Sequence, residues 1–498
     1  MEKPTLSPDS AKEESSSSTT TFGRLTTRAF ITNKHVAWSL LAFLAIGFGV
    51  AQLFVPAKFF IFAIMLIAGI LYTLTKPYLG LLLYYFVLVL KPAEMWSKLE
   101  TLGLERLFGG FLFASFILVS LMLYRRVRVV THNIYWAILL FFAVQILSLL
   151  VSVNPELTQD HVIDYFKNIA FVTMMIHIVD TPERFRGFIW FHVILMAYIA
   201  VSSLIAYMSG NVIVAQGITR IKSLTSAAGD PNALAATMDI ALPFVFLLMG
   251  REKNWGLKLI LLIFGGAMVY AVVLSGSRGG MMGLITMFIL LWLMAKRKVV
   301  TGVAVIAAAA LLITVMPAQY VGRYITVAKF AEEGNIDESS QERLDSWKAG
   351  REMFWDHPIL GVGAGAYGWA HGTMYSPKFR PTYLKAHSMY FQIIGELGVV
   401  GVVSFGFLVG SIFFYNFRLR RKLKALGPEG EFMRRISYAI VIATLTLFVT
   451  AIFAHSLYRM YWLFAGALTI IMLRIVDQGL VGEKPASETG RPVATIRS

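Results

Sequence analysis

The residues best suited to chemistry in this 498-residue chain are cations and histidines that stand beside long apolar stretches. One arginine lies in Ser277-Arg278-Gly279-Gly280, between two such stretches. A charge at membrane depth costs about 2.5–3.5 kcal/mol even on lenient scales, so such an arginine is usually paired or functional. An arginine that extends its guanidinium to the membrane surface would fit the same position. Residue chemistry alone leaves both interpretations open.

A second polar feature runs from Arg220 and Lys222 to Gly229-Asp230-Pro231-Asn232, directly before an apolar stretch. Asp230 or Asn232 predicts a helix cap at this point, with the proline in the first helical turn. The exposed N–H groups of the same helix end also favour an anion such as phosphate. Helix capping and anion binding are both compatible with the pattern.

A third polar feature is Ala386-His387-Ser388, with Glu396-Leu397-Gly398 further along the chain. Histidine has a pKa suited to general-base catalysis near neutral pH, although a histidine near a membrane surface can also be structural. His455 is a competing candidate by the same argument. Asp239, inside the stretch that follows the second feature, needs a partner or a wet cavity.

The composition places these residues in a membrane protein. Hydrophobic residues make up 57% of the chain and charged residues 15%, against roughly 45–50% and about 25% in soluble domains. The net charge of +16 comes from short Lys and Arg clusters between apolar segments, so it indicates topology and not a nucleic-acid partner. The lack of cysteine excludes disulfides, thiolate metal sites and a cysteine nucleophile. We predict no metal site and no cofactor.

Apolar stretches long enough for a helix to cross a bilayer recur along the chain. They predict an all-α polytopic integral membrane protein with about 12–14 transmembrane helices and one large periplasmic loop that carries short helices. The candidate spans are 36–54, 58–74, 78–92, 107–124, 134–152, 164–179, 187–209, 233–250, 257–275, 280–295, 300–316, 387–416, 436–454 and 457–475.

The basic clusters predict the orientation of these helices. Cytoplasmic connections carry an excess of Lys and Arg, and the clusters fall on those connections if the N-terminus is cytoplasmic. The three polar features then lie together on the outer side. The predicted organisation is a disordered cytoplasmic tail (1–33), a transmembrane bundle (34–316), a large periplasmic loop (317–386), C-terminal transmembrane helices (387–476) and a cytoplasmic tail (477–498).

The long loop has local signals of its own. The capping box from Ser339 to Glu342 predicts the start of a helix, and Pro358 predicts its end soon after Trp355. The segment from Gly361 to Gly368 contains G-x-G-x-x-G. A dinucleotide site would need a preceding strand and a parallel sheet, and the sequence predicts neither.

The order of these motifs resembles the O-antigen ligase and O-antigen polymerase superfamily. The resemblance covers roughly residues 215–410. It rests on the outer Gly-Asp-Pro-Asn, the Ser-Arg-Gly at a helix turn, a large loop with Arg343 and Trp347, Asp356-His357-Pro358-Ile359-Leu360-Gly361-Val362-Gly363, His387-Ser388 and Glu396-Leu397-Gly398.

The resemblance implies a metal-independent glycosyltransferase of the bacterial inner membrane that takes a glycan from undecaprenyl pyrophosphate at the periplasmic face. Arg278 would hold the pyrophosphate, Arg220 and Arg343 match two further arginines, and His387 would deprotonate the acceptor hydroxyl for attack on the anomeric carbon. Arginine forks match phosphate oxygens and stay charged, which supports these roles. The predicted catalytic residues are therefore His387, Arg278 and Arg343, and the predicted substrate-binding residues are Arg220, Lys222, Asn232 and Glu396.

Three acceptors fit this class: lipid A core in lipopolysaccharide assembly, the end of another glycan chain, and a protein hydroxyl. We favour a ligase role, with a polymerase as the alternative. A transporter or flippase, in which Arg278 and Asp239 would line a substrate path, is a different class. Such proteins often contain paired inverted repeats, and the sequence has no visible internal repeat.

Overall fold

The computed structural model describes residues 76–91, 109–114, 116–117, 132–215, 218–223, 229–321, 338–376 and 382–480. The predicted tail 1–33 and the predicted spans 36–54 and 58–74 lie outside the described residues, as do parts of the span 107–124, of the loop 317–386 and of the tail 477–498. The described residues all belong to one compact unit, Thr73–Ser498.

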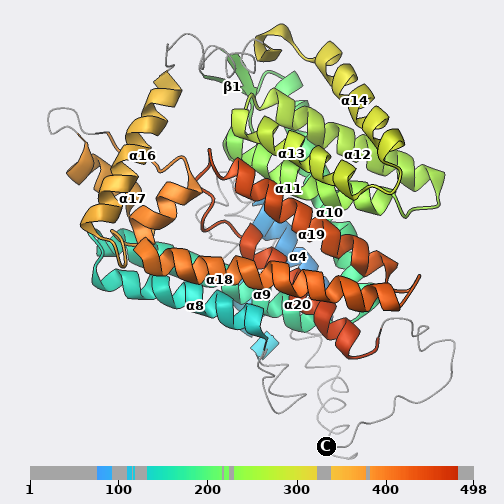
Figure 1. Ribbon diagram of the computed structural model, residues 1–498, viewed down its shortest axis with the longest axis horizontal. Helices are drawn as coiled ribbons and strands as arrows, with labels where there is room; N and C mark the ends of the chain where they lie inside the picture. The colour runs from blue at the N-terminus through green and yellow to red at the C-terminus, as the bar shows by residue number, and fades with distance from the viewer. Residues whose placement is uncertain are drawn as a thin grey trace, which may run out of the picture. The chain divides into compact units, whose positions relative to one another are not determined.

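Helices make up most of the described chain (Figure 1). The one sheet among the described residues is an antiparallel hairpin in which Ile213 pairs with Arg220, and it was not predicted from the sequence. The elements are α4 (Pro77–Leu90), α8 (Asn133–Leu147), η2 (Ser148–Leu150), α9 (Pro155–Ile178), α10 (Pro182–Met208), β1 (Val212–Ala215), β2 (Ile218–Ile221), α11 (Pro231–Met249), α12 (Trp255–Leu274), α13 (Arg278–Met294), α14 (Lys298–Val315), α16 (Glu338–Asp356), α17 (Tyr367–Ala370), η4 (His371–Tyr375), α18 (Met389–Ala425), α19 (Glu431–Thr450) and α20 (Tyr461–Asp477).

Several of these helices are long and apolar enough to cross a membrane, which confirms the prediction of an all-α polytopic membrane protein. Among the described residues, six helices meet that criterion by length and composition, and three shorter helices are also apolar. The six are Asn133–Leu150, Pro182–Met208, Pro231–Met249, Trp255–Leu274, Met389–Ala425 and Glu431–Thr450, and the shorter ones are Pro77–Leu90, Arg278–Met294 and Lys298–Thr314. The total number of spans stays a prediction.

Side-chain caps decide where the helices near the site begin. Asp230 Oδ1 accepts hydrogen bonds from the N–H groups of Asn232 and Ala233, at 2.8 and 3.0 Å, and Pro231 is the first helical residue of α11. This confirms the predicted cap. Ser277 Oγ accepts from the Gly280 N–H at 3.1 Å, so α13 begins at Arg278.

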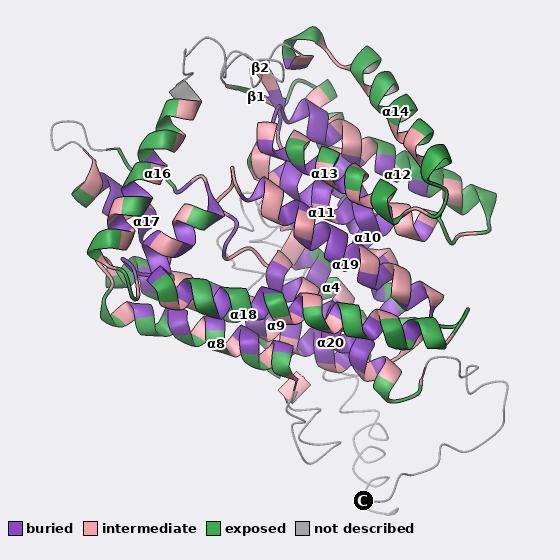
Figure 2. Cartoon of the chain, in the orientation of Figure 1, coloured by how far each residue is buried: buried purple, intermediate pink, exposed green. Residues whose placement is uncertain are grey.

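The centre of the bundle is formed by α11, which packs against α12, α13 and α19 (Figure 1). Helices α11 and α19 are largely buried, whereas α14 is mostly exposed (Figure 2). Glycine allows α13 to approach its neighbours closely. A Cβ atom at Gly283 would lie 2.5 Å from Asp239 Oδ2 on α11 and would also clash with Thr450 on α19.

The loop that follows the bundle folds onto the start of α18. Helix α16 begins within a residue of the predicted capping box, ends at Asp356 as Pro358 predicted, and packs against α18. The glycine-rich segment then bonds to the α18 backbone, with the Val362 N–H donating to the Gly395 carbonyl at 2.9 Å. Gly398, at φ +58°, breaks α18 just beyond this contact. A kinked helix and a glycine loop therefore hold each other in place.

We predict that Gly283→Ala lowers the thermal stability of the protein. The added methyl group has no room between α11, α13 and α19, and overpacking of this kind costs about 1–3 kcal/mol. The measurement is the unfolding temperature of the detergent-purified protein. Gly266→Ala on α12 is the control, because a Cβ atom there meets nothing within 4 Å. Equal unfolding temperatures for both variants would show that the close packing at Gly283 is not required.

Candidate functional site

The candidate site lies at one end of the bundle, where α11, α13 and α18 begin and α12 and α19 end. We call this end the site end. The Met389 N–H at the start of α18 donates a 2.9 Å hydrogen bond to the carbonyl of Ala451 at the end of α19. His387, two residues earlier, has a left-handed backbone conformation with φ +49°. Only a few per cent of residues other than glycine adopt this conformation, so the surrounding structure fixes the position of this histidine.

The two histidines that competed in the sequence analysis are neighbours in the structure. The ring centroids of His387 and His455 lie 6.0 Å apart with the rings nearly perpendicular, and both side chains are partly buried. Burial and the nearby charges of Arg343 and Lys385 lower the pKa of His387, while Asp230 opposes the shift. Burial, followed by the charge of Lys385, lowers the pKa of His455 to about 4. Neutral imidazoles at neutral pH are available as proton acceptors.

Arg343 reaches this pair from α16. Its guanidinium lies 5.7 Å from the ring centroid of Phe453, in the turn that follows α19. Trp347, one turn further along α16, stacks on Phe391 of α18 at 5.3 Å and nearly parallel. Aromatic stacking therefore holds α16 against α18. The cation–π contact holds Arg343 against the turn after α19, and its charge acts on His387.

Arg278 approaches the same turn from α13. Its Nη1 donates a 3.1 Å hydrogen bond to Ser340 Oγ on α16, so α13 and the loop helix meet at this arginine. A Cβ atom at the next residue, Gly279, would lie 3.1 Å from the Cβ of Phe453. Phe453 is thus a common neighbour of the Arg343 side chain and of the backbone beside Arg278. Phe453 could not be predicted from the sequence, because an aromatic side chain in an apolar stretch carries no local signal of a site.

Arg220 projects from β2 into the bundle and is only 6% exposed. Its Nε donates to the Ser275 carbonyl at 2.6 Å and its Nη2 to Asn232 Oδ1 at 2.9 Å. Arg220 and Asn232, both predicted substrate-binding residues, are therefore in direct contact, and Arg220 joins the hairpin to the end of α12 and the start of α11. Lys222, which directly follows β2, is partly buried.

Glu396 has different surroundings from the other predicted site residues. It is buried inside α18, where its Oε2 accepts a 3.1 Å hydrogen bond from the Gly365 N–H and lies 3.5 Å from Gln392 Nε2. These contacts lock the glycine-rich loop onto α18. These hydrogen bonds give Glu396 the role of a support for the loop.

Asp239 lies deeper in the bundle, on α11. It is fully buried, and within the described residues neither carboxylate oxygen has a hydrogen-bond partner. No group of three or more His, Asp or Glu side chains in the described ranges is arranged to hold a metal ion.

Comparison with known families agrees with the motifs that line the site. Residues 260–406 match the family model described as O-Antigen ligase, and this segment contains Arg278, Arg343 and His387. No curated protein matches the chain. The predicted resemblance to the O-antigen ligase superfamily is confirmed over residues 260–406, and the match supports a membrane glycosyltransferase of the general O-antigen ligase or polymerase type.

We predict that Lys385→Gln raises the pKa of His387, because the variant removes a positive charge that disfavours the imidazolium ion. The measurement is the rate at which diethyl pyrocarbonate modifies His387, followed by peptide mass spectrometry against pH. Only the neutral ring reacts, so the rate falls as the pH drops through the pKa. In the wild type we expect this fall below the ordinary histidine value of about 6.5, and in the variant at higher pH than in the wild type.

Lys348→Gln, on the exposed face of α16, is the matched control for this titration. It removes the same charge from a position that does not shift the pKa of His387. An identical fall in reactivity for Lys385→Gln and the wild type would show that the lysine charge does not act on His387.

Proposed function

We propose that the protein transfers a glycan from undecaprenyl pyrophosphate to an acceptor hydroxyl at the periplasmic face of the bacterial inner membrane, as an O-antigen ligase. One observation carries the proposal. The Arg343 guanidinium lies against Phe453 and its charge acts on His387, while Gly279, next to Arg278, packs against the same phenylalanine. All three predicted catalytic residues lie within the segment that matches the O-antigen ligase family. A proton acceptor beside two guanidiniums suits transfer from a phosphate-linked sugar.

In the proposed reaction, the neutral imidazole of His387 takes the proton of the acceptor hydroxyl. The acceptor oxygen then attacks the anomeric carbon, and the bond between that carbon and the pyrophosphate oxygen breaks. The electron pair of this bond leaves with the pyrophosphate, whose added charge is stabilised by Arg278 and Arg343. The His387 imidazolium returns its proton to water.

In many enzymes that release pyrophosphate, a divalent cation stabilises the negative charge of the leaving group. Here guanidinium groups would supply that positive charge. We therefore propose that transfer needs no metal ion. Arg220, held by Ser275 and Asn232, would position the start of α11 beside the donor. Lys222 is the further cation that we place near the donor, and Glu396 would act through the glycine-rich loop.

We predict that His387→Ala leaves the protein folded and inserted in the membrane but lowers glycan transfer by roughly 10²–10⁴-fold, the usual contribution of a general base. The measurement is the amount of glycan on the carrier lipid and on the acceptor in a strain that depends on the variant. Fully polymerised chains that accumulate on the carrier lipid indicate a ligase, whereas single repeats indicate a polymerase. Loss of the glycan from an acceptor protein would instead indicate protein glycosylation.

His177→Ala, on α9 near the opposite end of the bundle, is the control and should transfer glycan normally. Normal transfer by His387→Ala at equal protein levels would remove His387 from the mechanism.

We predict that Arg278→Lys also impairs transfer, by roughly 10- to 100-fold, since lysine keeps the charge but loses the two-pronged hydrogen bond to phosphate, worth about 1.5–3 kcal/mol. The measurement is the same transfer assay at saturating donor. Arg421→Lys, an exposed substitution near the other end of α18, serves as the control. Near-normal activity of Arg278→Lys would favour an arginine that merely extends to the membrane surface.

A further inference from the structure

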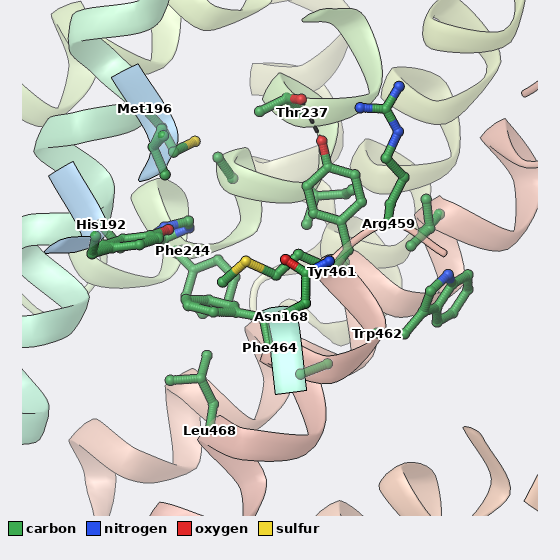
Figure 3. A pocket seen from close by; sticks show the side chains of 18 of the residues that line it. Asn168, His192, Met196, Thr237, Phe244, Arg459, Tyr461, Trp462, Phe464 and Leu468 are labelled. Atoms are coloured by element: carbon green, nitrogen blue, oxygen red, sulfur yellow. Dashed lines mark hydrogen bonds between the residues drawn. The ribbon is translucent and has the colours of Figure 1, made fainter. Parts of the chain in front are cut away.

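A cavity of about 280 Å³ lies within the bundle, walled by α4, α9, α10, α11, α19 and α20 (Figure 3). The turn between α19 and α20, residues 451–460, separates it from the candidate site. His455 of this turn faces His387, whereas Arg459 of the same turn lines the cavity. The cavity therefore adjoins the site without sharing its arginines or His387.

The walls of this cavity are largely hydrocarbon and aromatic. Met196, Phe244, Phe464 and Leu468 surround its interior (Figure 3). Small-molecule sites usually have volumes of roughly 300–1,000 Å³, so the space fits one flexible chain and not a whole membrane lipid. A hydrocarbon chain in the cavity would make van der Waals contacts with these wall side chains.

One buried polar atom in the wall points to a ligand. His192 is 7% exposed, and its Nδ1 pairs with the Tyr85 hydroxyl at 2.7 Å. Its Nε2 has no hydrogen-bond partner among the residues that the structure describes. When the tyrosine donates to Nδ1, the neutral ring carries its proton on Nε2. An oxygen acceptor from a ligand would satisfy this donor, since an unpaired buried donor costs about 1–3 kcal/mol.

The charged residues of the lining are all cationic. Lys91, at the end of α4, and Arg459 contribute positive charge, and no carboxylate is present among the described lining residues. Their charge is complementary to an anionic head group. The cavity thus presents two features to a ligand: cations for a phosphate and, separately, a neutral donor for another oxygen.

We propose that this cavity binds one acyl chain of an anionic glycerophospholipid, with its phosphate near Lys91 and Arg459. A glycerophospholipid has ester oxygens as well as a phosphate, so it can satisfy both His192 and the cations. An isoprenyl phosphate has oxygen only in its phosphate, so it would leave the His192 donor without a partner. The bound lipid fills the space behind the turn that carries His455, and it is separate from the glycan donor.

The test uses the delipidated full-length protein in detergent and dioleoyl phosphatidylglycerol as the probe. Native mass spectrometry should show one phosphatidylglycerol retained per chain in the wild type. Ala465→Phe fills the cavity and Arg459→Gln removes a cation, and each should reduce retention at least fivefold. Val403→Phe is the matched control, because Val403 faces outward on α18 and is 66% exposed.

His387→Ala should retain the lipid like the wild type, so this test does not depend on glycan transfer. Dioleoyl phosphatidylethanolamine, with the same chains and no net charge, should bind more weakly. Unchanged retention by both Ala465→Phe and Arg459→Gln would overturn the proposal. Retention of undecaprenyl phosphate in place of phosphatidylglycerol would overturn it as well, and would assign the cavity to an isoprenoid. If Ala465→Phe does not fold, Arg459→Gln decides alone.

Discussion

The backbone hydrogen bond from Met389 to Ala451 is the constraint on which the rest of the site depends. It joins the start of α18 to the end of α19, so the two bonded residues are separated in sequence by the whole length of both helices. On one side of the bond the chain passes through the left-handed His387, and on the other it enters the turn that carries Phe453 and His455. A shift of either helix along its axis would break this bond and separate the two histidines.

Residues without large side chains let the remaining elements reach this junction. Gly279 and Gly280 at the start of α13 lie against Phe453 and Ala235, and Gly283 lies against Thr450 and Asp239. Larger side chains at these positions would push α13 away from both α11 and α19. Arg278 stands next to these glycines, so the close packing of α13 also determines where its guanidinium meets α16. A change in the packing of α13 would therefore also move the guanidinium of Arg278.

The sequence was sufficient for the features that rest on local chemistry. Asp230 caps α11 and Pro358 follows the end of α16, because capping and proline geometry act within a few residues. Hydrophobic length was likewise sufficient for the membrane helices. The resemblance supplied His387, Arg278 and Arg343, whose functional roles stay predictions. What the sequence could not supply were non-local contacts. Phe453 and the hairpin that carries Arg220 have no distinguishing pattern until the helices are packed.

The turn between α19 and α20 is hydrogen-bonded to a helix on each side, and it borders both the candidate site and the cavity. Gln392 Oε1 of α18 accepts a hydrogen bond from the Leu457 N–H at 3.4 Å, and Trp462 Nε1 of α20 donates to the Ser456 carbonyl at 3.0 Å. A segment with hydrogen bonds to two packed helices has little freedom of its own. The side chains on its two faces are therefore positioned together: His455 toward His387, and Arg459 along the cavity. Because these contacts fix the turn between the site and the cavity, the packing of α18 and α20 sets the geometry of both.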